Sequence, residues 1–402
     1  MPVLVPIVLT ALSGLMLGLA LVPTTYLGLL ALVAGRHKPK VTSSRSTRFV
    51  FVVPAHNEEG GIAATVASLA AVDWPLDFVE TIVVADNCTD GTAAGAEAAG
   101  ATVLVRQHPQ LRGKGYALEF GFSHVLQHTK ADAVVVVDAD TVVSPNLLSA
   151  FAARIGEGAL AMQAEYGVRN VDASWRTEMM ALALAMFHTL RSNARERLGL
   201  SAGLRGNGMC FTRACLERFP QQAFGLVEDV EHGLALGRGG VRIVAVVDAH
   251  VLGEMVASGA ASESQRRRWE DGRTRLKTEV LPGVLMDALK TRSLMLFDLA
   301  MDLLIPPLST VAVLVACSLA VEGTRIALLG FSPWSAAALL PSGLLGLYVL
   351  RGMHLSGLGF RSVTVLLKAP AYVAWKLVLK LKGSAQKEEW VRTARETKPP
   401  PP

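Results

Sequence analysis

Charged residues are scarce in this chain of 402 residues, at 18% of the total, whereas apolar residues make up 51%. An ordinary soluble domain carries about 25% charged residues, so this composition predicts segments that lie in a membrane. The chain also lacks a long basic run interleaved with aromatic residues, and a nucleic-acid partner is therefore not expected. The formal net charge of +5 is compatible instead with a membrane surface or a phosphate-rich ligand.

Cysteine is equally rare. The four cysteines form no CxxC pair and stand in no zinc-type spacing with histidines; they are Cys88, Cys210, Cys215 and Cys317. This spacing argues against a zinc site. The absence of a disulfide framework is typical of a reducing compartment.

The first 35 residues are predicted to form a transmembrane helix. The run from Val3 to Ala34 is almost entirely apolar, and a membrane span needs about 20 residues. A cleaved signal peptide is not expected, because the run is too long and lacks a charged start. Basic residues follow at once: Arg36, His37, Lys38, Lys40, Arg45 and Arg48. By the positive-inside rule this end is cytoplasmic, which places the N-terminus outside.

Residues 48–256 change character, because short β-rich apolar runs alternate with helical stretches. The predicted strands are Phe49–Val53, Thr81–Ala85, Thr102–Arg106 and Val134–Val137. The predicted helices are Gly61–Ala71, Thr92–Ala99, Gly115–Gln127 and Pro145–Arg154, with a longer one at Trp175–Ala194. Continuous apolar strands separated by helices indicate a parallel sheet covered on both faces. Ligands of such sheets bind at the carboxyl ends of the strands.

The chain then returns to the membrane. Residues 257–302 contain a basic stretch and are expected to lie as helices at the membrane interface. Two transmembrane helices are predicted within residues 303–350, at Leu303–Ala320 and Ile326–Leu350, with their link at residues 321–325.

Residues 354–382 differ from these spans. Lysines recur there at multiples of four with aromatic residues between them, at Lys368, Tyr372, Trp375, Lys376 and Lys380. This pattern is typical of an amphipathic helix in the headgroup layer. Residues 383–402 end in a proline run and are expected to form a partly disordered cytoplasmic tail.

Two carboxylates follow the fourth predicted strand. The apolar run 134–137 leads directly to Asp138 and Asp140, and oxygen ligands of this kind suit Mg²⁺ or Mn²⁺, which share their shell with substrate phosphates. The alternative is that one Asp caps the next helix and the other is exposed. The strand before the motif and the other polar segments favour the metal site.

Polar residues also follow the first two predicted strands. Pro54, Asn57 and Glu58 come after the first strand, and Asp86 ends the second. A base and a ribose need acceptors of this kind for their N–H and O–H groups, although Asn and Asp also cap helices. Lys114 lies in a glycine-containing segment that matches no standard phosphate loop, and it is a candidate to contact a diphosphate.

The ordered motifs VPAHNEE, ADNCTDGT, DAD, VED and QRRRW resemble those of the family 2 inverting glycosyltransferases, which have a GT-A fold. More narrowly, they resemble the membrane branch that contains cellulose, hyaluronan and chitin-oligosaccharide synthases. The resemblance covers Phe49 to Trp269. It implies an α/β fold, namely a Rossmann-like nucleotide-sugar domain flanked by transmembrane helices.

The resemblance implies roles on the donor side. Glu58 and Asp86 correspond to positions that contact the nucleoside. Asp138 and Asp140 correspond to the donor–metal motif, with Asp140 as the more direct ligand. Arg268 of QRRRW corresponds to the arginine that approaches the diphosphate. The predicted donor-binding residues are Pro54, Asn57, Glu58, Asp86, Lys114, Asp138 and Arg268.

The resemblance also implies the base and the acceptor side. Asp229 corresponds to the general base, although Val227 replaces the usual Thr of the TED motif. Trp269 corresponds to the residue that lies against the acceptor sugar. Residues 205–210 occupy the place of a motif at the acceptor entrance, but they lack its usual FFCGS wording. The predicted acceptor-binding residues are Asn207, Glu228, Gln265 and Trp269.

The chemistry of these residue types agrees with the implied roles. A single displacement at the anomeric carbon needs a base for the incoming hydroxyl, and acids beside Asp229 are expected to raise its pKa toward the working pH. The alternative is an acidic helix N-terminus that favours the macrodipole. For Arg268 and Trp269, the alternative is a basic helix on lipid headgroups, although a planar guanidinium also grips phosphate and an indole offers sugars an apolar face.

The sequence therefore predicts a metal-dependent inverting glycosyltransferase of the inner (plasma) membrane, multi-pass, with its α/β domain in the cytoplasm. Its expected partners are a nucleotide-diphosphate sugar (most simply a UDP-sugar), Mg²⁺ or Mn²⁺, the lipid bilayer, and a saccharide or lipid-linked acceptor. Oligomerisation and export partners stay open. The alternatives are a processive synthase that translocates its polymer and, more remotely, a non-catalytic transferase-like subunit.

Overall fold

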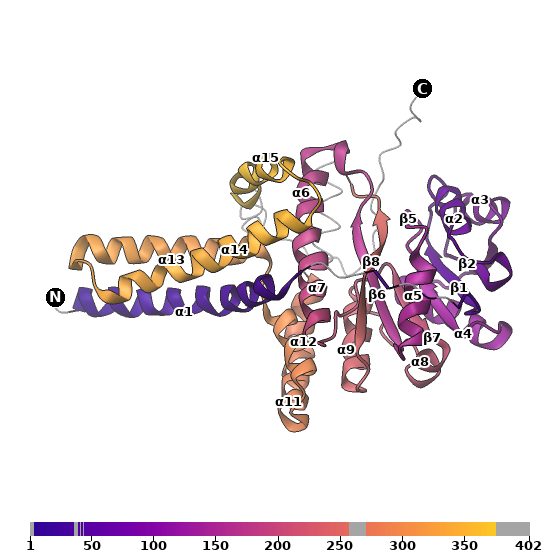
Figure 1. Cartoon of the computed structure of the whole chain (residues 1–402), viewed down its shortest axis with the longest axis horizontal. Coiled ribbons are helices and arrows are strands. Elements are labelled where there is room, and N and C mark those ends of the chain that lie inside the picture. Colours follow the sequence, from indigo (N-terminus) through magenta and orange to yellow (C-terminus); the bar gives the residue numbers. More distant parts are fainter. Residues whose placement is uncertain (1–3, 36–38, 41, 43, 257–270, 375–402) are drawn as a thin grey trace.

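The computed structural model describes residues 4–35, 39–40, 42, 44–256 and 271–374. They form an α/β domain from which an arm of three long helices projects (Figure 1). Helices α6, α7, α11 and α12 lie across the base of this arm, between it and the sheet. The predicted fold class, an α/β domain with flanking apolar helices, is confirmed.

One mixed sheet of eight strands organises the domain, in the order β3-β2-β1-β4-β7-β6-β8-β5. The strands are β1 Phe49–Ala55, β2 Val79–Asp86, β3 Thr102–Arg106, β4 Ala133–Val136, β5 Thr141–Val143, β6 Ala161–Val168, β7 Met209–Thr212 and β8 Ile243–Gly253. The four strands predicted from the sequence, β1 to β4, are parallel to one another. The prediction of an all-parallel sheet is incomplete, because β7 is antiparallel to β4 and β6.

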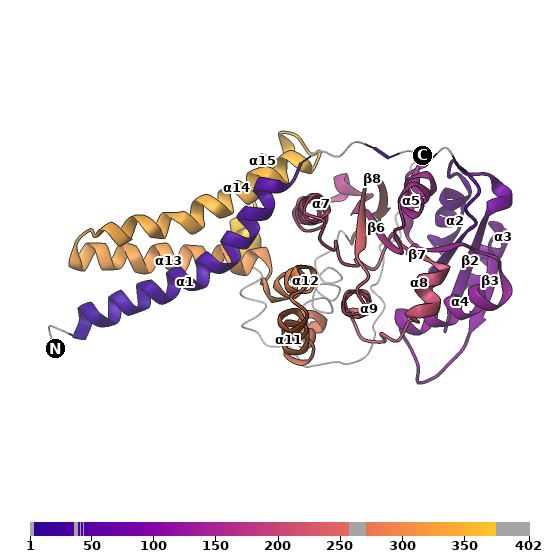
Figure 2. The same ribbon diagram turned by 60° about the horizontal axis from the view of Figure 1, so that its bottom comes forward.

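Strand β1 shows why the sheet is covered on both faces. Successive side chains of a strand point to opposite faces, and all of Phe49 to Val53 are buried. Phe49 and Phe51 pack into one core with α2, α3 and α5, and Val50 and Val52 pack into the other with α4, α8 and α9. Figure 2 shows these helices on the two sides of the sheet. Their bounds are α2 Ile62–Ala70, α3 Thr92–Ala98, α4 Lys114–His128, α5 Leu147–Gly156, α8 Arg213–Arg218 and α9 Glu228–Arg238.

A long helical segment leads from the sheet to the arm. The predicted helix Trp175–Ala194 is continuous, but a π-helical stretch, η3 (Ala185–Leu190), divides it into α6 (Trp175–Leu184) and α7 (Arg191–Arg197). Residues of this segment share a buried apolar cluster with α1 and Tyr348. The segment therefore joins the α/β domain to the arm.

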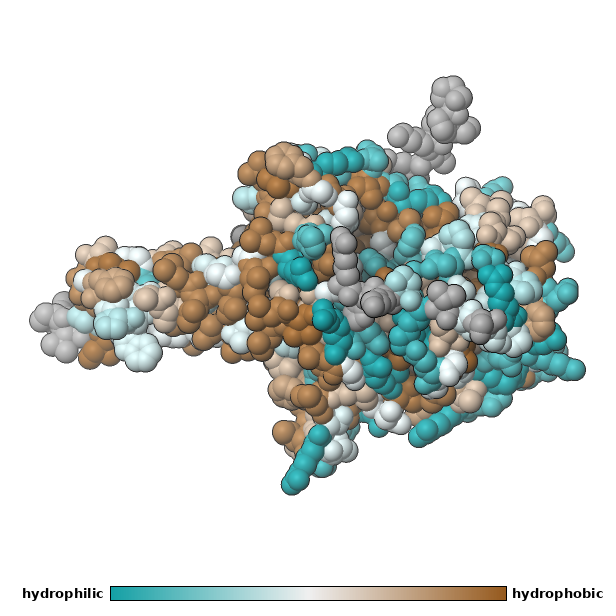
Figure 3. Space-filling view, in the orientation of Figure 1, coloured by the Kyte–Doolittle hydropathy of each residue, from teal (hydrophilic) through white to brown (hydrophobic). Residues whose placement is uncertain are grey.

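Three helices among the described residues are long and apolar enough to cross a membrane. They are α1 (Leu4–Val33), α13 (Leu308–Leu329), and the continuous helical stretch Pro333–Leu355, which comprises η4 (Pro333–Leu339) and α14 (Leu340–Leu355). Their outward faces are apolar, as the brown arm in Figure 3 shows.

The predicted link at residues 321–325 is wrong, because α13 runs through it and the chain turns after Gly330, which has a φ of 85°. Glu322 and Arg325 form an ion pair of 2.7 Å on one side of this helix. Ser13 of α1 donates to Glu322, and Arg325 donates to Ser335. Because each charge is neutralised inside the helix bundle, the polar residues do not interrupt the helix.

At the base of the arm, α11 spans Leu281–Thr291, α12 spans Leu294–Leu304, and α15 (Arg361–Leu367) lies near them. Helix α12 packs on α9 through an apolar cluster that includes Leu234 and Leu299. Trp375, Lys376 and Lys380 of the predicted amphipathic segment, the tail, and Arg36, His37 and Lys38 lie outside the described residues.

Candidate active site

The carboxyl ends of β1 and β2 are shaped by two asparagines. Asn57 and Asn87 have φ values of 56° and 52°, a left-handed conformation that Asn tolerates better than most residues. The Asn57 side-chain oxygen accepts from the Thr89 N–H at 2.7 Å, and the Asn87 oxygen accepts from the His108 N–H at 2.8 Å. These bonds tie the loops after three neighbouring strands together at one edge of the sheet.

Asp86 lies buried at this edge. Its Oδ1 accepts from Arg106 Nη1 at 2.6 Å and from the Asn87 side-chain amide at 3.0 Å, and its main-chain oxygen is 2.7 Å from His56 Nδ1. The Arg106 guanidinium also lies 5.6 Å from the centre of the Tyr116 ring, which stacks on Phe224 at 4.3 Å. A carboxylate beside flat aromatic and guanidinium surfaces is suited to a planar polar ligand such as a base.

The loop after β1 completes this side of the site. Pro54 and Ala55 end the strand, and the Glu58 N–H donates to Thr92 Oγ1 at 2.7 Å. The Glu58 carbonyl accepts from Ile62 at the start of α2. The structure therefore brings Pro54, Asn57, Glu58 and Asp86 together at the ends of β1 and β2.

The acidic turn after β4 holds Asp138 and Asp140, both partly buried. Lys114, at the start of α4, donates to Asp138 Oδ1 and to the Gly206 carbonyl, the latter at 2.6 Å. Burial lowers the pKa of Lys114, but the negative charges of Asp138 and Glu228 raise it, and the net change is upward. Lys114 is thus a cation at neutral pH and links the acidic turn to the loop before β7.

The donor set of this turn fits a hard divalent cation. No group of three or more His, Cys, Asp or Glu side chains suitable for a metal occurs among the described residues. Mg²⁺ and Mn²⁺ do not need such a cage, because they are commonly held by one or two carboxylates together with substrate phosphates. Asp138 and Asp140 are two carboxylates of this kind on one turn, and Lys114 is a cation in contact with the first of them.

Asn207 holds both ends of the acidic turn through hydrogen bonds of its side chain. It is fully buried, its side-chain oxygen accepts from the Asp138 N–H at 3.2 Å, and its amide donates to Thr141 Oγ1 at 2.8 Å. Gln163 donates to the Asn207 carbonyl at 2.7 Å. Both ends of this amide therefore bond within the chain, and its role toward an acceptor stays a prediction.

Glu228 and Asp229 begin α9 on the other side of Lys114. Burial, followed by the charge of Asp229, raises the pKa of Glu228 to about 7, although Lys114 lowers it. Burial also raises the pKa of Asp229, against the lowering effect of Lys114. Gly206 lies so close that a Cβ placed on it would stand 3.3 Å from Asp229 Oδ2 and 3.6 Å from Lys114 Nζ. Glu228, with its pKa raised to about 7, can exchange a proton near neutral pH, and the pKa of the adjacent Asp229 is shifted in the same direction.

The structure therefore brings Lys114, Asp138, Asn207, Glu228 and Asp229 together. The predicted residues Gln265, Arg268 and Trp269 lie outside the described residues. The sequence analysis did not identify Arg106, the ion-pair partner of Asp86. Arg106 ends a predicted strand, and because ligands bind at the carboxyl ends of such strands, this position could have identified it as a site residue.

Comparison with known proteins agrees with this geometry. The α/β fold with its flanking apolar helices is the GT-A fold of glycosyltransferases. The family model described as "Glycosyltransferase like family 2" matches residues 47–272, more than half of the chain, and the chain belongs to this family.

Curated relatives include enzymes named for glycolipid synthesis. The β-monoglucosyldiacylglycerol synthase of Synechocystis sp. is 28% identical over 252 residues, which are 58% of this chain and 50% of that protein. The enzyme of the same name from Nostoc sp. is 26% identical over 299 residues, which are 70% of this chain and 62% of that protein. The chain thus spans about half the length of the first of these relatives and somewhat more of the second.

Among solved structures, the mannosyltransferase PcManGT from Pyrobaculum calidifontis, in complex with GDP-Man and Mn²⁺, superposes with a TM-score of 0.52. The superposition covers 91% of this chain and 98% of that chain, at 19% sequence identity. This likeness concerns the fold, and it extends over both the α/β domain and most of the remaining chain.

Proposed function

We propose that this protein transfers a sugar, with inversion, from a nucleotide-diphosphate sugar to a lipid-linked or saccharide acceptor at the cytoplasmic face of the inner membrane. One observation carries the proposal: a partly buried lysine, Lys114, contacts Asp138 and lies beside Glu228 and Asp229, whose pKa values are raised. This arrangement combines a cation for a departing diphosphate with a carboxylate that can take a proton.

On the donor side, Asp86 and Arg106 bind the nucleoside. Asp86 keeps a second carboxylate oxygen for ribose or base donors while Arg106 holds the first. The Tyr116–Phe224 stack borders the same region. The superposed mannosyltransferase carries GDP-Man and Mn²⁺, which supports a nucleotide-sugar donor and a divalent cation at Asp138 and Asp140. The cation neutralises charge on the diphosphate when it is bound.

Asp229 is the proposed general base. Inverting transfer is one displacement, so the acceptor hydroxyl must lose its proton as it attacks the anomeric carbon. Burial raises the pKa of Asp229 and so increases its affinity for a proton, whereas the positive charge of Lys114 lowers this pKa and favours the ionised form that acts as a base. Glu228 lies next to the base and is proposed to bind the acceptor. Arg268 and Trp269 are proposed to contact the diphosphate and the acceptor, respectively.

A lipid-linked acceptor is favoured over a growing polymer. The two curated relatives described above are named as monoglucosyldiacylglycerol synthases, which supports a glycolipid product. The described residues contain three helices that could span a membrane. This number is small for a single chain that would have to build a polymer channel. A processive synthase remains the alternative if several copies complete such a channel.

The test is product analysis by mass spectrometry. Membranes containing the protein are incubated with a panel of nucleotide sugars, with and without added lipid acceptors, next to membranes containing Asp229→Asn. A single-sugar lipid product that depends on Asp229 supports the proposal. A long polymer would support the processive alternative, and donor-independent background in both samples would refute transferase activity.

A further inference from the structure

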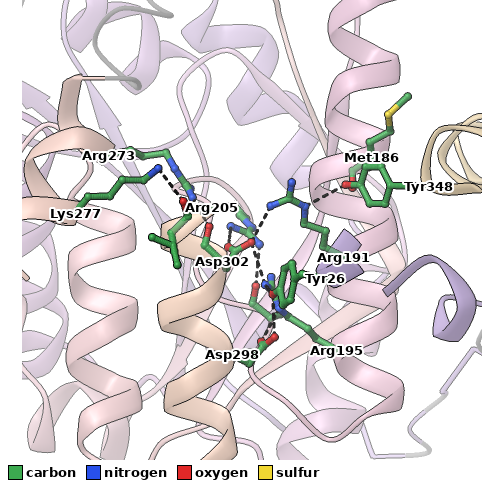
Figure 4. Close-up of polar contacts among 12 residues, drawn as sticks. Tyr26, Met186, Arg191, Arg195, Arg205, Arg273, Lys277, Asp298, Asp302 and Tyr348 are labelled. Atoms are coloured by element: carbon green, nitrogen blue, oxygen red, sulfur yellow. Dashed lines mark hydrogen bonds and ion pairs between the residues drawn. The ribbon is translucent and has the colours of Figure 1, made fainter. Parts of the chain in front are cut away.

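A second charged group lies outside the residues assigned above. Arg191 and Arg195 of α7, Arg205 of the loop before β7, and Arg273 bring four guanidinium groups together, and we call them the arginine cluster (Figure 4). Arg191, Arg195 and Arg205 are all less than one-tenth exposed. Such burial of guanidinium groups is costly unless opposite charges compensate for it.

Among the described residues, fewer carboxylates form ion pairs with the cluster than it has guanidinium groups, and Asp229 acts on Arg205 and Arg273 without forming an ion pair with them. Among the described residues the contacting acids are Asp298 and Asp302 of α12, two negative charges against four positive ones. Asp302 Oδ1 lies 2.9 Å from both Arg191 and Arg195, and Asp298 Oδ2 lies 2.7 Å from Arg195. These two acids are therefore engaged mainly by the arginines of α7.

Arg205 and Arg273 are left with weaker compensation. Arg205 reaches Asp302 only at 3.5 Å, and Arg273 donates to the main-chain carbonyl of Asp302 at 2.7 Å. Both guanidinium groups lie over the Phe187 ring, at 4.5 and 5.3 Å from its centre. Contacts of this kind are weaker than an ion pair. Burial accordingly lowers the pKa of Arg205 to about 10 and also lowers the pKa of Arg273.

The cluster also contains buried polar atoms that have no partner among the described residues. They are Arg205 Nε, Arg195 Nη1 and His188 Nδ1. Buried polar groups in proteins nearly always form hydrogen bonds. Two of these atoms are guanidinium N–H donors beside an excess of positive charge, which indicates a ligand that accepts hydrogen bonds and carries negative charge.

The position of the cluster indicates which ligand this is. Arg205 directly precedes Gly206, which lies beside Asp229 and Lys114. On the opposite side, Tyr26 of α1 donates to Asp298 at 2.9 Å, and Tyr348 of α14 accepts from Arg191 at 3.0 Å. The cluster thus lies between the proposed base and the apolar arm.

We propose that the arginine cluster binds a phosphate group of the acceptor, so that the acceptor is a phosphate-bearing lipid with its reactive hydroxyl at Asp229. This inference rests on the proposed function. A phosphate diester supplies one negative charge, which offsets part of the excess positive charge, and several oxygens that can accept from the unpartnered guanidinium N–H groups. The donor diphosphate is a different ligand, because Lys114, the cation proposed for it, pairs with Asp138, whereas the cluster pairs with Asp298 and Asp302.

The first experiment measures binding without turnover. Full-length protein in detergent is titrated by calorimetry with dihexanoylphosphatidylglycerol, with neutral dihexanoylglycerol and with inorganic phosphate. The wild-type protein is expected to bind the phosphatidylglycerol and to bind the neutral lipid far more weakly. Equal affinity for inorganic phosphate would overturn the lipid assignment, and equal affinity for the neutral lipid would overturn the phosphate site.

Variants then assign the binding to the cluster. Arg205→Gln is expected to weaken phosphatidylglycerol binding by about tenfold or more, because a charge-assisted hydrogen bond is lost. Arg205→Lys keeps the charge and is expected to restore part of the affinity. Arg238→Gln is the matched control, since Arg238 forms a half-exposed pair with Asp287 away from the cluster. Equal binding by Arg205→Gln and wild type, or equal loss in the control, would refute the assignment.

Kinetics separates this inference from the proposed function. Arg205→Gln is expected to raise KM for phosphatidylglycerol by about tenfold and to leave KM for the donor unchanged. A raised donor KM would show that the cluster serves the diphosphate, which overturns the inference. Transfer to neutral lipid alone would refute the phosphate site but not the transferase. Absence of transfer to any acceptor would refute the transferase, while the binding titrations would still decide the phosphate site.

Discussion

Gly206→Ala is a direct test of the site geometry. Gly206 has a φ of 80°, a conformation in which a Cβ costs about 1–2 kcal/mol. The new methyl group would also stand 3.3 Å from Asp229 Oδ2 and 3.6 Å from Lys114 Nζ. The first of these distances is closer than an ordinary van der Waals contact, so the carboxylate must move by a few tenths of an ångström. Misplacing a catalytic group on this scale is expected to lower turnover by about tenfold to a hundredfold.

A matched control separates the two effects. Gly240 has the same φ of 80°, and a Cβ placed on it meets no atom within 4 Å. Gly240→Ala is therefore expected to cost the same backbone strain, about 1–2 kcal/mol, without touching the site. Both variants should show a similar decrease in melting temperature, measured in one detergent, but only Gly206→Ala should lose turnover at saturating donor and acceptor.

Two results would refute this reasoning. If Gly206→Ala transferred sugar at the wild-type rate, Asp229 and Lys114 would not act where the structure places them. If both alanine variants lost turnover in proportion to their melting temperatures, the loss would reflect stability rather than a displaced base. Donor affinity of Gly206→Ala, measured by nucleotide titration, should stay within a few-fold of wild type.

Four further outcomes are expected. Asp229→Asn should lower turnover by about 10² or more and spare donor affinity, the scale of a lost general base; normal turnover with collapsed donor affinity would contradict the assignment. Asp140→Asn, like excess chelator, should abolish transfer because the carboxamide cannot hold a hard cation; full turnover in chelator would show that no metal is needed. Burial raises the pKa of Glu228 from 4.5 to about 7, so the folded state holds its proton more tightly and stability is lost as pH rises through this window. Glu228→Gln should therefore raise the melting temperature at about pH 8 and leave it unchanged at about pH 4, and the reverse order would contradict the burial argument. A reporter fused to the C-terminus should be active in the cytoplasm, whereas activity only in the periplasm would exclude the proposed topology.

The strands and helices in the first half of the α/β domain, such as β1, β3 and α3, could be predicted from the sequence. The strand predicted at Thr102–Arg106 matches β3. The strand predicted at Phe49–Val53 matches β1 except for its last two residues. The helix predicted at Thr92–Ala99 ends one residue later than α3. These segments have continuous apolar runs with polar residues at their ends, and local pattern is sufficient for them.

The second half of the sheet could not be predicted in this way. Strand β8 begins with the apolar run 243–247 but continues through Asp248 and His250, and β6 is interrupted by Gln163 and Glu165, so the apolar pattern does not give their full extent. Gln163 is buried because its amide bonds to the Asn207 carbonyl and its oxygen accepts from the Arg205 N–H. Such long-range partners are not visible in a local pattern, which is why the antiparallel strand pairs were missed.

The same limit applies to the charged residues of the helices. Glu322 and Arg325 predicted a break between two spans, whereas their mutual ion pair and Ser13 allow one helix to continue. Asp298 and Asp302 lie in the segment 257–302 that was expected at the membrane interface, and their partners are arginines that are distant in the sequence. From the sequence alone, a charged residue is interpreted as exposed, because its ion-pair partner is visible only in the structure.

The sequence by itself determined the order of the parts: an apolar helix, alternating strands and helices with acidic residues after the strands, and a second apolar region. It did so because periodicity and strand-end chemistry are local properties of the chain. Only the tertiary structure decided that Lys114, Asp138, Gly206 and Asp229 meet, and that four arginines gather between them and the arm. These contacts join segments far apart in the chain, and they form only when the packing of the sheet and helices brings those segments together.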